Sequence, residues 1–175
     1  GGAFEDSGIY NDDSKWEEGV LYISNCLIAA NENLCSIYTI QDNTRLIGDY
    51  AFRYCEALTE IIIPDSVTSI GISAFNYCRN LNQVYYFGDN FNDITIGSDN
   101  SYLLNANIIY LKLGDTDRDN TIGINDATLT QMYIADLEVS NTENNLCADV
   151  NGDGEVNVKD VTLIQMYLAD LIEEF

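Results

Sequence analysis

Asp115-Thr-Asp-Arg-Asp-Asn-Thr-Ile-Gly-Ile-Asn-Asp126 and Asp149-Val-Asn-Gly-Asp-Gly-Glu-Val-Asn-Val-Lys-Asp160 are two twelve-residue stretches with the same pattern. Each has a short oxygen-bearing side chain at its positions 1, 3, 5 and 12. Calcium binds about six to eight oxygen atoms, and a loop of this length supplies them from those side chains, from the carbonyl of position 7 and often from a water at position 9. The pattern therefore predicts two calcium sites. Their predicted ligands are Asp115, Asp117, Asp119, Thr121 and Asp126 in the first loop, and Asp149, Asn151, Asp153, Glu155 and Asp160 in the second.

A duplicated helical segment follows each loop. Residues 127–137 and 161–171 share eight of eleven residues at an offset of 34. An EF-hand also has a helix before its loop and a Glu at position 12, whereas here residues 111–114 are too short for that helix and position 12 is Asp. We therefore expect two loop-then-helix units. The apolar stripes expected on these helices are Leu129, Tyr133 and Leu137 in the first, and Leu163, Tyr167 and Leu171 in the second.

These features make residues 113–175 resemble a dockerin, the calcium-folded module that attaches cellulosomal proteins to cohesins on a scaffoldin. The resemblance implies an all-α module with two Ca²⁺, a cohesin partner, and a secreted protein associated with a cellulosome and with polysaccharide degradation. Position 9 is Gly123 in the first loop and Asn157 in the second. Because glycine has no side chain to complete the coordination there, we expect the first calcium site to be the weaker one.

The resemblance also implies a partner surface. In dockerins, the two residues before the last calcium ligand and the pair five and six residues beyond it commonly face the cohesin. Met132 and Met166 could instead belong to a core, but a flexible methionine suits a partner surface. Because the repeats match, a rotation of about 180° would present nearly the same surface, so two binding orientations are available. The implied contacts are Ile124, Asn125, Gln131, Met132, Ala135 and Asp136, and Val158, Lys159, Gln165, Met166, Ala169 and Asp170.

The first part of the chain is repetitive too. Ile47-Gly-Asp-Tyr-Ala-Phe-Arg-Tyr-Cys-Glu-Ala-Leu58 recurs as Ile70-Gly-Ile-Ser-Ala-Phe-Asn-Tyr-Cys-Arg-Asn-Leu81, with seven of twelve positions identical and a period of 23. That period is typical of leucine-rich repeats, in which each unit adds a short strand and buries its apolar positions against its neighbours. The sequence of these units resembles the bacterial surface-antigen class of leucine-rich repeats. It predicts a mostly β solenoid in residues 1–112, truncated at its N-terminus, and the dockerin in residues 113–175.

Several segments complete this expected solenoid. Ala3-Phe4 is interpreted as the end of an earlier unit, residues 19–30 as a hairpin, and residues 92–96 and 107–110 as closing strands. Cys55 and Cys78 hold the same repeat position, which favours a ladder of small buried residues over a redox pair or a metal site. Cys26 and Cys35 could meet across the hairpin, although free thiols are expected.

Charge and composition exclude several classes of function. The formal net charge is −22, and clustered Lys and Arg are absent, so neither nucleic acid nor an anionic membrane is expected as a partner. The chain has no histidine, which removes Ser-His-Asp and Cys-His catalysis. It begins with Gly1 rather than Met and shows no signal peptide, and we interpret it as a fragment of a longer protein.

The sequence therefore predicts a non-catalytic cellulosome component whose repeat domain is a scaffold or a protein-recognition module. Two alternatives stay open. The chain could be a calcium sensor or buffer, although sensor hands open by swinging pairs of helices. It could also be the C-terminal part of a cellulosomal enzyme whose catalytic domain lies upstream.

Overall fold

The computed structural model describes residues 8, 10–137 and 146–175. The chain divides into two compact units, Gly1–Tyr110 and Leu111–Phe175. This division lies two residues before the domain boundary that the sequence predicts. The expected repeat end at Ala3-Phe4 lies outside the described residues.

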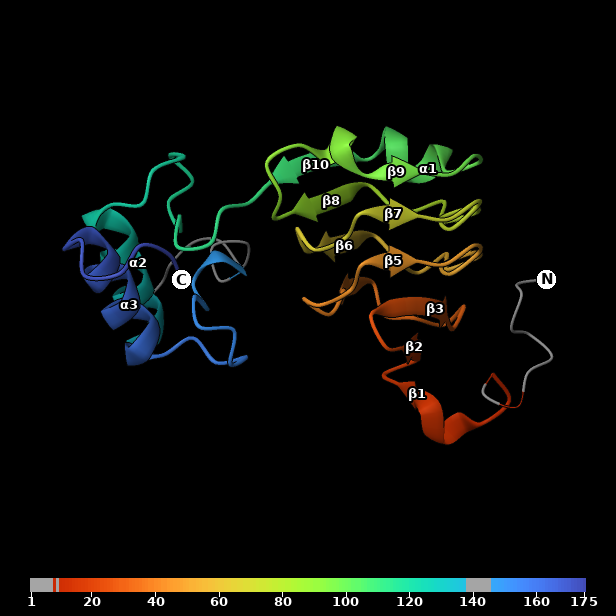
Figure 1. Ribbon diagram of the computed structural model, residues 1–175, viewed down its shortest axis with the longest axis horizontal. Helices are drawn as coiled ribbons and strands as arrows, with labels where there is room; N and C mark the ends of the chain where they lie inside the picture. The colour runs from red at the N-terminus through yellow and green to blue at the C-terminus, as the bar shows by residue number, and fades with distance from the viewer. Residues whose placement is uncertain (1–7, 9, 138–145) are drawn as a thin grey trace. The chain divides into compact units, whose positions relative to one another are not determined.

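The first unit is a solenoid with two sheets. Figure 1 shows β5, β7 and β9 stacked along one side of it and β6, β8 and β10 along the other. The six-stranded sheet has the order β1 (Trp16–Glu17), β2 (Val20–Ile23), β3 (Cys26–Ala30), β5 (Leu46–Ile47), β7 (Ser69–Ile70) and β9 (Thr95–Ile96). The four-stranded sheet has the order β10 (Asn107–Tyr110), β8 (Gln83–Tyr86), β6 (Glu60–Ile63) and β4 (Ile37–Thr39). Short helices η1 (Asp13–Lys15), η2 (Phe91–Asp93) and α1 (Ser101–Asn105) complete the described elements of this unit.

The sequence period appears directly in the strand register. Ile37 pairs with Glu60 and Glu60 with Gln83, in parallel. The next strand continues this sheet, because Gln83 pairs with Asn107. Two of these four strands, β4 and β10, lie outside the complete repeats found in the sequence. Their turns lack the Ala-Phe-x-Tyr-Cys motif, although the strands pair in the same sheet. The strands expected within residues 92–96 and 107–110 are thus confirmed as β9 and β10.

Equivalent repeat positions stack inside the solenoid. The rings of Phe52 and Phe75 have centroids 4.9 Å apart and planes 15° apart. The Cys78 thiol donates to the carbonyl of Phe52 at 3.0 Å, and the Cys55 thiol donates to the carbonyl of Asn31 at 3.4 Å. Burial raises the pKa of both thiols to about 12. The two cysteines therefore form the expected structural ladder.

The hairpin expected in residues 19–30 is confirmed as β2 and β3. They pair antiparallel, and Ser24 in the turn has φ 52°. Strand β3 then pairs in parallel with β5, so the hairpin continues the six-stranded sheet. Cys26 and Cys35 are free thiols.

The second unit contains α2 (Ile124–Ile134) and α3 (Val158–Leu168). One buried cluster among its described residues consists of Ala127, Val150 and Ile164, with Leu113, Ile122, Leu163 and Phe175 packed against it. None of the helices in the described part of the chain has the length and apolar character that crossing a bilayer requires.

The expected apolar stripes on these helices are only partly confirmed: Leu163 packs against the core, and Leu129 and Tyr167 are half-buried, but the other three positions are exposed. Tyr133 is 41% exposed, and Leu137 and Leu171 are 56% and 69% exposed. The buried face instead begins at the last residue of each loop, because Asp126 and Asp160 are 1% and 0% exposed and lie in the first turn of their helices. Successive helix residues are about 100° apart, so fixing this aspartate inward fixes every later position.

Candidate calcium loops and partner surface

The first loop gathers carboxylates into a small volume. Asp115, Asp117 and Asp126 each offer an oxygen within 4.8 Å of the others. Asp126 Oδ1 accepts hydrogen bonds from the N–H groups of Thr116, at 2.7 Å, and Asp117, at 3.0 Å. Burial raises the pKa of Asp115, and the charges of Asp126 and Asp117 raise it further. Such crowding of negative charge is favourable when a cation lies among the oxygens.

One buried oxygen supports a cation site directly. Asp115 Oδ1 is buried and finds no hydrogen-bond partner among the described residues, although Oδ2 of the same group accepts from the Asn120 N–H at 3.0 Å. A buried acceptor without a partner is costly, so the residues present fit a bound divalent cation. The oxygen-only donor set suits calcium or magnesium, and a flexible loop with several carboxylates favours calcium.

The second loop repeats the hydrogen bonds of the first. In both loops the N–H of position 6 donates to the carboxylate of position 1, at 3.0 and 2.8 Å. The N–H groups of positions 5 and 7 donate to the side chains two residues earlier. The carboxylate of position 12 accepts from the N–H of position 9, at 2.6 and 2.8 Å, and from that of position 3, at 3.0 and 3.3 Å. Positions 4 and 6 have positive φ in both loops. Local sequence thus folds both loops in one way.

The predicted ligands do not all converge equally. Asp119 lies outside the set of close carboxylates in the first loop, and its carboxylate accepts from Thr121. In the second loop the side chain of Asp153 forms an ion pair with Lys159 at 3.0 Å, and the hydrogen bond from Lys159 lowers the pKa of Asp153. Asp149 is half-buried, whereas Asn151, Asp153 and Glu155 are exposed.

The structure gives no support to the prediction that the first site is the weaker one. At position 9 the second loop has Asn157 where the first loop has a glycine. The side-chain oxygen of Asn157 caps α3 by accepting from the Lys159 N–H at 2.9 Å. Its Nδ2 donates to the carbonyl of Glu155 at 3.1 Å. Both the oxygen and the nitrogen of this side-chain amide therefore form hydrogen bonds with backbone groups. The relative affinity of the two sites stays a prediction.

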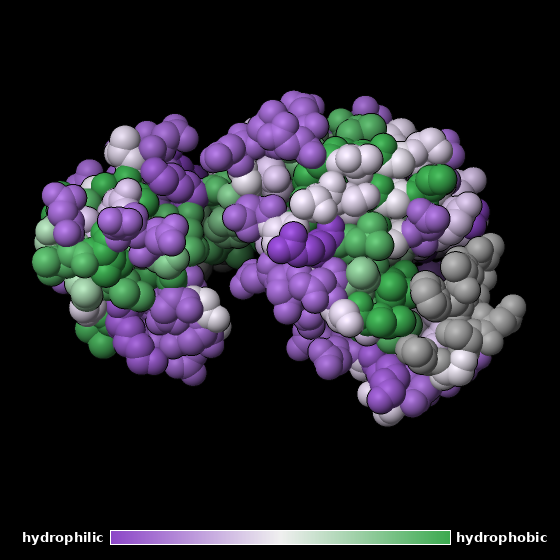
Figure 2. All heavy atoms as spheres, in the orientation of Figure 1, coloured by the Kyte–Doolittle hydropathy of each residue, from purple (hydrophilic) through white to green (hydrophobic). Residues whose placement is uncertain are grey.

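The expected partner residues lie mostly on the surface. Ile124 and Val158, at equivalent positions, are 67% and 69% exposed. Figure 2 shows apolar residues gathered on the visible face of the helical unit, among polar ones. Only Met132 and Met166 of the expected contacts are half-buried. The exposed ones are Ile124, Asn125, Gln131, Ala135 and Asp136 in the first repeat, and Val158, Lys159, Gln165, Ala169 and Asp170 in the second.

Two of these residues also end the helices. Asp136 and Asp170 both have φ 55°. The N–H of Leu137 donates to the carbonyl of Met132 at 3.0 Å, and the N–H of Asp136 to that of Tyr133 at 3.0 Å. This pair of bonds closes a helix with a left-handed residue. The aspartates thus have a structural role whatever they contact. The exposed apolar residues that sequence reasoning missed are Tyr133, Ile134, Leu137, Leu168 and Leu171.

Comparison with known families adds to this geometry. The BspA type leucine rich repeat region matches residues 3–129, in six copies, and the dockerin type I domain matches residues 113–169. The chain belongs to the BspA type leucine-rich repeat family, and it ends in a type I dockerin domain. The two matches overlap, and the structure places the overlap in the unit that begins at Leu111. The resemblances expected from the sequence are therefore confirmed.

Both regions are interaction modules. A dockerin implies binding to a cohesin, and type I dockerins bind calcium. The repeat region indicates a protein-interaction module, and both regions are typical of extracellular or cell-surface bacterial proteins.

Searches of individual proteins add little. No curated protein matched the chain. A leucine-rich repeat protein from Eubacterium ventriosum matches 53% of this chain and 33% of its own length, with 16% identity and a TM-score of 0.30. The chain thus spans about a third of that protein.

Proposed function

We propose that this chain is a non-catalytic, secreted component of a cellulosome, held there by its dockerin. The dockerin is an all-α module of two EF-hand-like loop-helix repeats that binds two Ca²⁺ and a cohesin of a scaffoldin. The leucine-rich repeat domain serves as a scaffold or protein-recognition module. The observation that carries this proposal is the set of hydrogen bonds that the two loops share, with Asp126 and Asp160 buried at equivalent places.

Calcium would link each loop to its helix. Asp126 and Asp160 belong both to the loops and to the first turns of α2 and α3. The core between the helices is small, and small modules often depend on a metal for stability. Bound calcium would offset the crowded charge of Asp115, Asp117 and Asp126 and so stabilise the helix pair. Cohesin binding should therefore depend on calcium.

The cohesin surface would be made by the exposed side of both helices. Ile124 and Val158 supply equivalent apolar contacts, and Gln131 and Gln165 supply equivalent polar ones. The same surface is thus presented in two orientations related by the internal duplication. Lys159 replaces Asn125 in the second repeat, so an acidic cohesin rim would favour the orientation that uses Lys159, by about 0.2–1 kcal/mol.

The two alternatives have less support. A sensor hand needs a helix before its loop, and the described residues 111–114 form none. A catalytic domain elsewhere in a longer protein would make the parent an enzyme without changing the role of these two modules.

A binding experiment tests the proposal. The full chain is applied to a panel of immobilised cohesins, once with calcium and once with a chelator. Calorimetric titration with calcium gives the number of ions bound per chain. We expect capture by at least one cohesin in calcium only, and two ions per chain. The matched control is Asp42→Asn, which removes one charge outside the loops, beside Asp117→Asn, which removes one inside. Equal capture in chelator and calcium would contradict the proposal.

A further inference from the structure

The repeat domain carries a stack of tyrosines on its surface. Tyr54 and Tyr77 hold equivalent repeat positions, and their ring centroids are 4.7 Å apart with planes at 11°. Their φ values are 67° and 64°, so both turns have the same left-handed backbone at this position. Tyr54 is 40% exposed. The stack therefore presents aromatic surface to solvent at its N-terminal end.

The chain already places guanidinium groups against this stack. The central carbon of the Arg79 guanidinium is 5.7 Å from the Tyr77 ring centroid, and Arg79 pairs with Glu56 at 3.7 Å. The guanidinium of Arg53 lies 4.8 Å from the Tyr54 centroid and 5.9 Å from that of Tyr77. Because the Arg53 guanidinium is near both of these nearly parallel rings, it lies beside the stack rather than on the face of Tyr54 that is turned away from Tyr77. Arginine on tyrosine, beside a glutamate, is thus the local pattern.

One turn earlier, the residue at the position of Arg79 is acidic rather than basic. Glu56 holds the repeat position that Arg79 holds in the next turn. The hydrogen bond from the Cys55 thiol to the carbonyl of Asn31 places the preceding turn beside Tyr54. In that turn, Glu32 and Asn33 lie where an aromatic residue would be needed to continue the stack. Glu32 and Glu56 therefore lie in successive turns beside the partly exposed ring of Tyr54.

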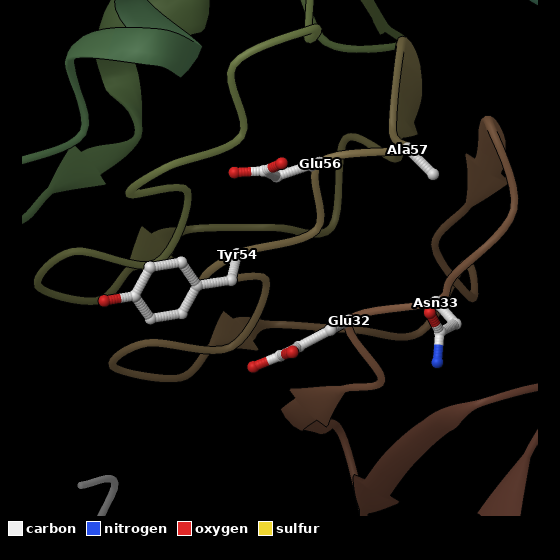
Figure 3. A pocket seen from close by; sticks show the side chains of 5 residues that line it. All are labelled: Glu32, Asn33, Tyr54, Glu56 and Ala57. Carbon is white, nitrogen blue, oxygen red and sulfur yellow. The ribbon is translucent and has the colours of Figure 1, made fainter.

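These residues line a pocket of about 570 Å³. Its described lining consists of Glu32, Asn33, Tyr54, Glu56 and Ala57. Figure 3 shows the Tyr54 ring between Glu32 and Glu56, with both carboxylates directed to the same side as the ring. No basic residue is found among the described residues that line the pocket.

We propose that this pocket binds an arginine side chain from a basic segment of a partner protein. The guanidinium would stack on Tyr54 and pair with Glu32 and Glu56, as Arg79 does on Tyr77 with Glu56. The formal charge of −22 would draw a basic segment toward the chain. An anionic ligand would meet the carboxylates of Glu32 and Glu56, and a purely apolar ligand would pair with neither. This site is separate from the dockerin and does not depend on cohesin binding.

The test measures binding of a labelled peptide with four arginines spaced by Gly and Ser to the full chain in calcium, by fluorescence polarisation. The same peptide with citrulline, a neutral isostere of arginine, is the ligand control. We expect Tyr54→Leu and Glu32→Gln each to weaken binding about three- to fivefold. Tyr54→Phe keeps the ring and should keep the affinity. Asp42→Asn removes the same charge outside the pocket and should change the affinity less than about 1.5-fold, as for a distant exposed charge.

Three outcomes would overturn the proposal. Equal losses in Glu32→Gln and Asp42→Asn would mean general attraction to an acidic chain. Equal binding of the citrulline peptide would mean that no cation is recognised. Binding of a neutral cello-oligosaccharide that requires Tyr54, without binding of the arginine peptide, would make the pocket a sugar site. Circular dichroism of each variant verifies the fold, and unchanged cohesin capture keeps this result independent of the dockerin.

Discussion

Phe175 packs against the core of the helical unit, and we expect its removal to destabilise that unit. Its ring contacts the cluster of Ala127, Val150 and Ile164, and its centroid is 5.2 Å from that of Tyr167. Full burial of a phenylalanine stabilises by about 1.5–3 kcal/mol, so this partly buried ring should contribute about 1–2 kcal/mol. In a unit of this size, each 1 kcal/mol shifts the melting temperature by about 4–8 °C. Phe175→Ala should therefore lower the Tm of the helical unit by roughly 4–15 °C.

A second substitution separates the ring contact from backbone effects. Gly114 has φ 84°, and a Cβ there would lie 2.6 Å from Cε2 of Phe175. Gly114→Ala should cost about 1–2 kcal/mol from the left-handed backbone and about 1–3 kcal/mol from overlap with the ring. The overlap disappears when the ring is removed. The double variant should thus be more stable than the summed losses predict, by about 1 kcal/mol or more.

The assay is thermal and urea unfolding of the full chain in saturating calcium, followed by the helix signal in circular dichroism. Glu174→Ala, at the exposed neighbouring position, is the control and should change the stability by less than about 0.5 kcal/mol. Losses that add to within about 0.3–0.5 kcal/mol in the double variant would refute the reasoning, because they would show that the ring and Gly114 do not interact.

Four further predictions concern calcium, the cohesin and the thiols. A chelator should remove the helix signal and leave the sheet signal, and each site saturated at 100 times its Kd should add about 2.7 kcal/mol of stability; an unchanged spectrum would contradict this. Met132→Ala and Met166→Ala should each weaken cohesin binding mildly and together severely, as measured by calorimetry, whereas one damaging and one silent single variant would mean a single orientation. In the folded chain a thiol reagent should modify the exposed Cys35 and spare Cys55 and Cys78 until unfolding. Because burial raises the pKa of Cys55 and Cys78 to about 12, they contribute stability below their unfolded pKa of about 8.5, and urea titrations should show this contribution lost as the pH rises from there toward 12.

Local rules made much of the molecule predictable. The calcium loops follow from side chains two residues apart, since each binds the backbone N–H of the residue two positions later. The register between the two complete repeats follows from their period of 23, because Ile47 and Ile70 can be buried together only if their strands stack. The hairpin follows from its turn at Ser24.

The faces of the helices were not predictable in this way. Leu129, Tyr133 and Leu137 have a helical period, but the period gives no absolute phase. Tethering of Asp126 inside the first loop sets that phase and turns Tyr133 outward, and only the folded loop shows it. The side-chain motif of the complete repeats does not extend to the turns that hold β4 and β10, because strand pairing constrains the backbone and leaves the side chains free to differ.

The sequence by itself determined which loops resemble calcium sites, which segments form helices and which residues recur in the solenoid, since each depends on residues close along the chain or on a fixed period. The tertiary structure alone decided the pocket beside Tyr54. Glu32 and Glu56 lie 24 residues apart in the sequence and become neighbours only when successive turns stack. Their chemistry as a pair exists because the solenoid brings each turn within contact of the one before it.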